Sequence, residues 1–185
     1  FQQILINIKP VSTSLLVSMA RKYAYHGGAE KVGKARMDDA AVSYKKTYGV
    51  CRAIQGMKVE RALQYLDDVV EHKDIVPIFK FHGGASRHPQ CNKWGINRGR
   101  WPEKSVRMVR SLVIQAANHA KAMHQVEREN LTVISYQIGL SGNINHRRNY
   151  RAHGRVNGYN SEPCHVQIIC APVQEAVPAA KELKQ

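Results

Sequence analysis

The fold is decided by two apolar segments, LTVISYQIG at residues 131–139 and CHVQIICA at residues 164–171. Both are rich in β-branched residues, which favour extended strands. Between them lies the basic run HRRNYRAHGR at residues 146–155, and no aspartate or glutamate occurs in residues 130–161. We therefore predict two paired strands joined by a long β-hairpin whose end is rich in arginine.

The connection between the two predicted strands is too long for a tight turn. Extended as two strands of about 12 residues each, it reaches roughly 40 Å beyond the sheet at 3.3 Å per residue. A two-stranded arm cannot bury a core of its own. Arginine binds phosphate through two parallel hydrogen bonds and stacks on bases, and Tyr150 and Tyr159 add rings that can stack as well. We therefore expect the arm to be stabilised by threading into RNA.

The whole chain is strongly basic. It has 185 residues, of which 28 are lysine or arginine and 14 are aspartate or glutamate, so its formal net charge is +14. This imbalance favours a polyanionic partner, either nucleic acid or an anionic membrane surface. A hydrophobic fraction of 43% is enough for a core, and the length indicates one domain with extensions. No apolar run approaches the roughly 20 residues that span a bilayer, so no membrane span is expected.

The cysteines do not form a metal-binding pattern. There are four, without any Cys-x-x-Cys pair, which predicts free thiols in a reducing compartment. His88 and Cys91 have ligand-like spacing, but zinc needs a second such pair, and an isolated cysteine is more often a small core residue. The chain also lacks a Gly-Lys-Ser/Thr phosphate loop and a Gly-x-Ser-x-Gly nucleophile elbow. We expect no metal and no cofactor.

A metal-dependent nuclease is the enzyme class that the histidines suggest. Side chains of the kind such enzymes use occur in and beside the basic stretch: His146, Asn149, His153, Asn157 and His165. However, the only nearby carboxylate is Glu162, and the arginines would repel a divalent cation. The nuclease stays an alternative, and the expectation is that the chain is not an enzyme.

Helical spacing of apolar residues occurs in two further segments. It predicts a helix over 58–72 and a longer one over 102–125, with a proline at its start. A shorter helix is expected over 47–55, with its threonine as the N-cap. We expect a short strand at 40–44 and an arm without a core of its own at 23–37, which is basic, glycine-rich and aperiodic.

Residues 75–101 form a long segment with a different character. Glycine and proline recur, and lysines and arginines alternate with two phenylalanines and two tryptophans, without any acidic residue. Loops of this length are usually functional or disordered, and the aromatic residues argue against disorder. We expect some of these rings to anchor the segment on the core and the basic side chains to contact RNA.

Four short strings occur in an order that resembles one protein family: RAIQGM at 52–57, GRWPEKS at 99–105, YRAHGR at 150–155 and SEPCH at 161–165. They are similar to the ribosomal proteins called L seventeen in eukaryotes and L twenty-two in bacteria. The resemblance covers about residues 19–172, and leaves 1–18 as an extension and 173–185 as a C-terminal tail. It implies an α+β fold, in which a three-stranded antiparallel sheet packs against helices and a long β-hairpin arm protrudes over about 131–171.

The resemblance also implies a function. Proteins of this family are structural constituents of the large ribosomal subunit that bind its RNA and neighbouring ribosomal proteins. Their hairpin reaches the nascent-peptide exit tunnel and thus the nascent polypeptide. The insertion at 75–101 is similar to the eukaryotic form, which implies a cytosolic ribosome that is assembled in the nucleus. An RNA-binding or assembly factor outside the ribosome is the remaining alternative.

The residues expected to bind RNA are basic or aromatic and lie both in the globular part and on the arm: Lys45, Lys46, Arg87, Lys93, Trp94, Arg98, Arg100, Lys104, Arg147, Arg148, Tyr150, Arg151, His153 and Arg155. By the same resemblance, Asn145, His146 and Arg147 are expected to form the tunnel tip. Asn143 and Asn145 depart from the family pattern, which usually has basic or bulky residues there. The approach to the tip is therefore less positive than in the family.

Overall fold

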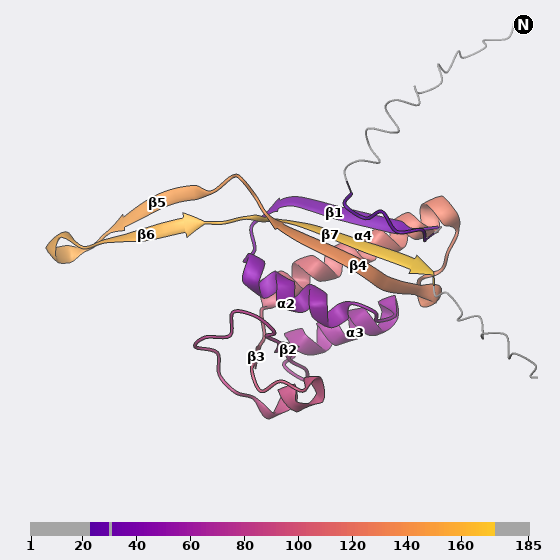
Figure 1. Cartoon of the computed structure of the whole chain (residues 1–185), viewed down its shortest axis with the longest axis horizontal. Helices are drawn as coiled ribbons and strands as arrows, with labels where there is room; N and C mark the ends of the chain where they lie inside the picture. The colour runs from indigo at the N-terminus through magenta and orange to yellow at the C-terminus, as the bar shows by residue number, and fades with distance from the viewer. Residues whose placement is uncertain (1–22, 30, 173–185) are drawn as a thin grey trace, which may run out of the picture.

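The computed structural model describes residues 23–29 and 31–172, so the expectations for 1–18 and 173–185 lie outside the described residues. Its centre is a three-stranded antiparallel sheet in the order β1-β7-β4 (Figure 1). The strands are β1 (Gly33–Ala40), β4 (Leu131–Leu140) and β7 (Cys164–Pro172). The predicted α+β class, the three-stranded sheet and the pairing of its two main strands are confirmed.

Three helices pack against one face of this sheet (Figure 1). They are α2 (Tyr44–Ile54), α3 (Val59–Val70) and α4 (Glu103–His124). Helix α4 lies on β1 and β7, and both α2 and α3 pack against α4. The helices predicted over 58–72 and 102–125 are confirmed to within a few residues.

The alternation of side chains along β7 assigns its two faces. Val166, Ile168 and Cys170 are buried in the main core beneath the helices. Ile169 and Ala171 lie in a smaller apolar cluster on the other side. Because successive residues of a strand point to opposite faces, this near-continuous apolar run indicates a central strand covered on both sides.

Close packing between α4 and β1 depends on small residues. A Cβ atom added at Gly33 would lie 2.3 Å from the carbonyl oxygen of Ala116 and 2.8 Å from the Cβ of Ala120. Both alanines are fully buried on the helix. Gly33 is therefore required by the close approach of the helix to the strand.

The beginning of the domain differs from the prediction. Part of the segment predicted to lack a core forms β1. Of the strand predicted at 40–44, only Ala40 is in a strand, as the last residue of β1, and the chain then bends into α2. β1 contains no β-branched residue and takes its conformation from pairing with β7, which a local pattern does not report. The N-cap prediction was also wrong. Ser43 precedes the helix, and Thr47 lies inside it with its hydroxyl donating to the Ser43 carbonyl at 2.9 Å.

The insertion between α3 and α4 is anchored by aromatic residues. Its ends form a short pair of strands, β2 (Val76–Pro77) and β3 (Gly99–Arg100), and its middle holds a 3-10 helix, η1 (Pro89–Trp94). The Trp101 indole N–H donates to the carbonyl of Asp74 at 2.7 Å. This confirms that some of the rings fix the segment on the core.

The hairpin arm consists of β5 (Asn145–Tyr150) and β6 (Val156–Ser161), together with the turn between them. It projects beyond the end of the three-stranded sheet (Figure 1). Every residue of both strands is exposed. The predicted arm is thus confirmed as an antiparallel pair that buries no core of its own.

Candidate nucleic-acid interface

The strands of the hairpin arm place arginine beside tyrosine. Arg147 pairs with Tyr159 across the two strands, and the guanidinium carbon of Arg147 lies 5.4 Å from the centre of the Tyr159 ring. Tyr159 remains 62% exposed and Tyr150 74% exposed. Both rings and the guanidinium are therefore accessible to a ligand. The rings can stack on a base, and the guanidinium can stack on a base or bind phosphate.

The far end of the arm is a tight turn. His153 and Gly154 both adopt left-handed backbone angles, with φ of 60° and 69°. The amide of Arg151 donates to the carbonyl of Arg155 at 2.8 Å, which closes the turn. In the described part of the chain, no carboxylate lies within ion-pair distance of these two arginines, nor of the two on β5. Four guanidinium groups are thus available for an external anion.

The predicted position of the tip needs correction. Asn145, His146 and Arg147 lie at the end of the hairpin nearer the sheet, because Asn145 pairs with Ser161. The strand register centres the turn on residues 151–155 instead. The sequence correctly predicted the hairpin, but only the pairing of β5 with β6 identifies the residues at its distal end.

The residues considered for a nuclease do not converge. His146 lies opposite Asn160 near the sheet, His153 lies in the distal turn, and His165 belongs to β7. Among the described residues, no group of three or more His, Cys, Asp or Glu side chains could hold a metal ion. The arrangement along the arm is that of a binding surface.

A cluster of polar groups, here called the clasp, holds the junction between sheet and arm. It consists of Asp39, Ser141 and Asn143. The carboxylate of Asp39 accepts a hydrogen bond from the Ser141 hydroxyl, and its other oxygen accepts one from the Asn143 side-chain amide at 3.0 Å. The Asn143 backbone amide donates to the Ser141 hydroxyl oxygen at 3.1 Å. The clasp therefore ties the end of β1 to the chain where it leaves β4.

Asp39 also has an unusual backbone. Its φ is 51°, at an irregularity in the pairing of β1 with β7 between Met37 and Ala40. Left-handed conformations are uncommon for residues other than glycine, although aspartate tolerates them better than most. The hydrogen bond from Ser141 lowers the pKa of the Asp39 carboxyl, and the bond from Asn143 adds to this effect. The carboxylate is thus ionised and committed to the clasp at neutral pH.

Sequence reasoning missed Asp39 and Ser141. The available signal was the neutral stretch at 142–145, which leads into the basic run at 146–155. In the structure this stretch is where the clasp holds the chain, and Asn143 contributes two of its hydrogen bonds. Asparagine at that position therefore has a structural partner within the chain.

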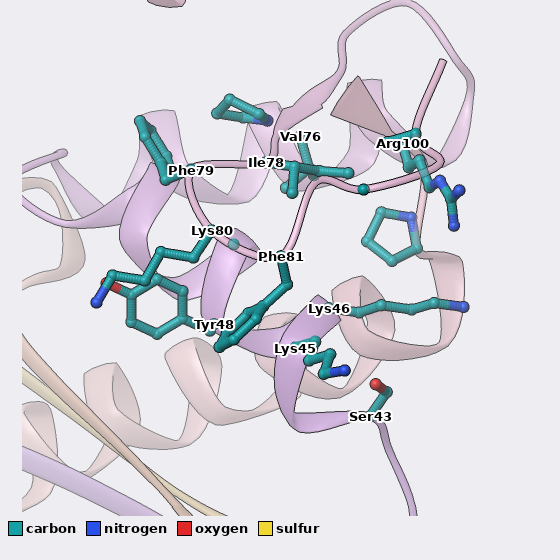
Figure 2. Close-up of a pocket in the computed structure, with 15 residues that line it drawn as sticks. Ser43, Lys45, Lys46, Tyr48, Val76, Ile78, Phe79, Lys80, Phe81 and Arg100 are labelled. Atoms are coloured by element: carbon teal, nitrogen blue, oxygen red, sulfur yellow. The ribbon is translucent and has the colours of Figure 1, made fainter. Parts of the chain in front are cut away.

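In the globular part, three of the predicted RNA-binding residues gather around one pocket. Lys45 and Lys46 lie in the first turn of α2, and Arg100 lies in β3. Figure 2 shows these side chains to one side of the aromatic rings of Tyr48, Phe79 and Phe81, which also line the pocket. Lys104 is exposed in the first turn of α4.

The remaining predicted residues are more deeply tied into the insertion. Arg87 and Arg98 face each other in an isolated β-bridge, and the Arg98 guanidinium donates to the carbonyl of His82 at 2.9 Å. Lys93 forms an ion pair with the largely buried Asp74. Trp94 packs edge-on against Tyr65 with 5.9 Å between ring centres. Lys93 and Trp94 thus have structural partners in this chain.

The four cysteines are free and buried, as predicted. Burial raises the pKa of the Cys170 thiol to about 12 and also raises that of Cys51. Such thiols are protonated at neutral pH and are poor nucleophiles. They act as small core residues. Separately, none of the helices within residues 31–172 has the length and hydropathy needed to cross a bilayer.

Comparison with known proteins gives consistent matches over most of the chain. The family model described as "Ribosomal protein L22p/L17e" matches residues 35–171. The "Large ribosomal subunit protein uL22" of Caenorhabditis elegans is 38% identical over 144 residues, which are 78% of this chain and 76% of that protein. The protein of the same name from Debaryomyces hansenii is 35% identical over 167 residues, covering 90% and 89% of the two chains. The "Large ribosomal subunit protein uL22B" of Saccharomyces cerevisiae is 36% identical over 166 residues, again covering 90% and 89%.

Proposed function

The chain belongs to the ribosomal protein L22p/L17e family, and from this premise we propose that its hairpin arm threads into the RNA of the large ribosomal subunit. As a member of this family it is a structural constituent of that subunit and not an enzyme. Its partners are ribosomal RNA and neighbouring ribosomal proteins of the subunit.

One observation carries the proposal for the arm. Four arginines project from a hairpin that is exposed along its whole length and buries no core. An isolated two-stranded hairpin is at best marginally stable in water, so an external partner must stabilise it. Because the arm offers cations without intramolecular carboxylate partners, that partner is a polyanion.

The mechanism is electrostatic binding combined with shape. Contacts from Arg147, Arg148, Arg151 and Arg155 to phosphates fix the position of the arm and release counterions. Selectivity comes from the shape of the folded RNA around the hairpin, because double-stranded RNA hides its base edges in a deep, narrow groove. Lysines and arginines of the globular part add further phosphate contacts.

The distal turn, residues 151–155, is the part of the arm that reaches the nascent-peptide exit tunnel in this proposal. There it contacts the nascent polypeptide, while residues 145–147 contact RNA closer to the sheet. The protein works in the cytosolic ribosome and joins the subunit during its assembly in the nucleus. The length and exposure of the arm support this placement.

Sedimentation tests whether the chain is a ribosomal constituent. A tagged chain expressed in Saccharomyces cerevisiae, which has a relative 36% identical to it, should sediment with mature large subunits in a sucrose gradient. An assembly factor would instead sediment with precursor particles only. A nuclease would cleave RNA in a metal-dependent way and lose that activity in His146→Ala or His153→Ala.

Photo-crosslinking tests the tunnel placement. A photoreactive phenylalanine at Tyr150, beside the distal turn, should crosslink to a stalled nascent chain. The matched control is the same probe at Met123, which is similarly exposed (65% against 74%) but lies at the end of α4. Crosslinks of equal strength at both positions, or none at Tyr150, would contradict the placement of the turn in the tunnel.

A further inference from the structure

A pocket lies in the globular part, and no residue of the hairpin arm lines it. It opens between the first turns of α2, the loop that follows β2, and Arg100 of β3 (Figure 2). Its volume of about 160 Å³ is many times that needed for a single water molecule. The lining combines apolar side chains, such as Val76 and Ile78, with aromatic rings and cationic groups. We call it the loop pocket.

Three aromatic rings shape the loop pocket: Tyr48, Phe79 and Phe81. Phe81 is 58% exposed, although phenylalanine is usually buried. Its φ is 61°, in the left-handed region that a bulky residue rarely adopts. Strained conformations of this kind persist where the surrounding structure enforces them, and they are concentrated at functional sites. The loop thus holds an aromatic ring at the surface at an energetic cost.

The charges around the loop pocket all have the same sign. Lys45, Lys46, Lys80 and Arg100 line it, and no aspartate or glutamate does. The Lys45 ammonium lies 5.4 Å from the centre of the Phe81 ring, and the Lys80 ammonium lies 5.6 Å from that of Tyr48 (Figure 2). Each ammonium therefore lies over one face of its ring. A base stacked on the opposite face would place its phosphate within reach of the cations that line the pocket.

We propose that the loop pocket binds one unpaired nucleotide of RNA, with its base stacked on Phe81 and its phosphates bound by Lys45, Lys46 and Arg100. This inference rests on the proposed RNA-binding function and specifies one of its contacts. Stacking on aromatic side chains is the usual way in which proteins hold single-stranded bases, and cationic residues beside the rings track the backbone. A duplex cannot use such a site, because its bases are already stacked.

A nucleotide fits both the aromatic rings and the cationic side chains of the loop pocket, because it has a planar base and a phosphate. An acidic peptide would neutralise the cations, but it would leave the exposed Phe81 ring without a planar partner. An apolar peptide segment would cover the rings and leave the lysines beside them unpaired. The combination of ring faces with cations, and the lack of carboxylates in the lining, favours RNA over either kind of protein segment.

The test compares two RNA probes on the full-length chain. One is a fluorescent hexauridylate, and the other is a hexamer of abasic ribose phosphates with the same charge. Phe81→Leu should weaken binding of hexauridylate by about fivefold or more and leave binding of the abasic hexamer unchanged. Because Phe81 is largely exposed, the thermal midpoint of the variant should remain close to that of the parent.

Two further variants separate the ring from the loop and from the charges. Phe81→Asn suits the left-handed backbone better than phenylalanine but removes the ring, so it should lose hexauridylate binding as Phe81→Leu does. Lys46→Gln should weaken both probes equally and lower the salt dependence of binding. Ultraviolet crosslinking to hexauridylate should also give an adduct on the peptide that contains Phe81.

Equal affinity of Phe81→Leu and the parent for hexauridylate would overturn the proposal, and it is the result expected if a protein segment fills the pocket. An equal loss for both probes would overturn it too, because base stacking would not be involved. This test does not depend on the sedimentation experiment. If the chain were absent from large subunits but still needed Phe81 to bind hexauridylate, the ribosomal function would be contradicted and the nucleotide site in the loop pocket would be supported.

Discussion

Ser141 donates its hydroxyl hydrogen to the carboxylate of Asp39, 102 residues away in the sequence. This bond joins the last residues of β1 to the first residue after β4, where the chain leaves the sheet for the arm. Ser141 is buried, and its backbone amide donates at 3.0 Å to the carbonyl of Pro163, which lies between β6 and β7. The segment that enters the arm and the segment that returns from it therefore both bond to Ser141. This junction determines the direction in which the hairpin leaves the sheet.

Asp39→Ala is expected to loosen the arm without unfolding the domain. The substitution removes the acceptor for both Ser141 and Asn143, so the junction loses two hydrogen bonds. Hydrogen exchange monitored by mass spectrometry should show faster exchange in the peptide that contains 141–145 and unchanged exchange in β7. Asp38→Ala is the matched control, because it removes a neighbouring carboxylate that bonds to Arg36. Equal exchange in the two variants would show that the clasp does not hold the arm.

The clasp should also depend on pH. Hydrogen bonds from Ser141 and Asn143 hold the pKa of Asp39 below its ordinary value of 3.8. A carboxyl whose pKa is lower in the folded state contributes stability above its unfolded pKa and loses it as the pH falls through the folded pKa. Protonation of Asp39 should therefore shift the side-chain amide resonance of Asn143 only below about pH 4. Asp39→Asn should remove this transition, and a transition below about pH 4 that persists in Asp39→Asn would contradict the assignment.

Arg151→Glu should impair incorporation into the large subunit while the isolated protein still folds. Arg151 is exposed at the start of the distal turn, so the thermal midpoint should hardly change. Binding to large-subunit RNA should weaken. The slope of the logarithm of the binding constant against the logarithm of salt concentration should become less negative by about 1. Arg61→Glu makes the same change of charge on the exposed surface of α3. Loss of folding in Arg151→Glu would mean that the arm is part of the core.

Gly33→Ala is expected to destabilise the domain by about 1–3 kcal/mol. The added methyl group would lie 2.3 Å from the backbone carbonyl oxygen of Ala116, so the strand or the helix must shift. Urea denaturation followed by circular dichroism measures the free energy of unfolding. The control is Gly28→Ala, because a Cβ atom at Gly28 meets no atom within 4 Å. The control should change stability by no more than about 0.5 kcal/mol.

Local patterns in the sequence predict most of the sheet and the three helices that pack on it, although α2 begins before the residue predicted to cap it. β4 and β7 contain runs of β-branched residues, and α3 and α4 have apolar residues at helical spacing, so each element carries its own signal. β1 carries none, because its sequence GKARMDDA has no β-branched residue and no run of large apolar residues. It becomes a strand through pairing with β7 and through the fit of Gly33 against α4. Such tertiary determinants are not visible in a single sequence.

The binding residues also divide into those that the sequence identifies and those that only the fold identifies. Charge and composition identify the arginines of the arm, because their exposure follows from a hairpin without a core. They do not identify the clasp, which brings Asp39 to Ser141 across the fold. Nor do they distinguish a lysine that faces solvent from one, such as Lys93, that neutralises a buried carboxylate. These distinctions depend on which distant residues the fold brings together.

Lys93→Ala separates a structural role from a role in RNA binding. The ammonium of Lys93 pairs with Asp74, whose side chain is only 9% exposed and whose other oxygen accepts a hydrogen bond from the Ile75 amide at 2.6 Å. Removal of the lysine leaves this carboxylate without its cation, but the 48% exposure of Lys93 lets water compensate in part. We expect a loss of about 1 kcal/mol in the free energy of unfolding. Lys46→Ala should leave stability unchanged, because Lys46 is exposed at the start of α2. Lys93→Ala should therefore lower the free energy of unfolding, whereas Lys46→Ala should lower the affinity for RNA. If Lys93 only bound RNA, Lys93→Ala would behave like Lys46→Ala in both measurements.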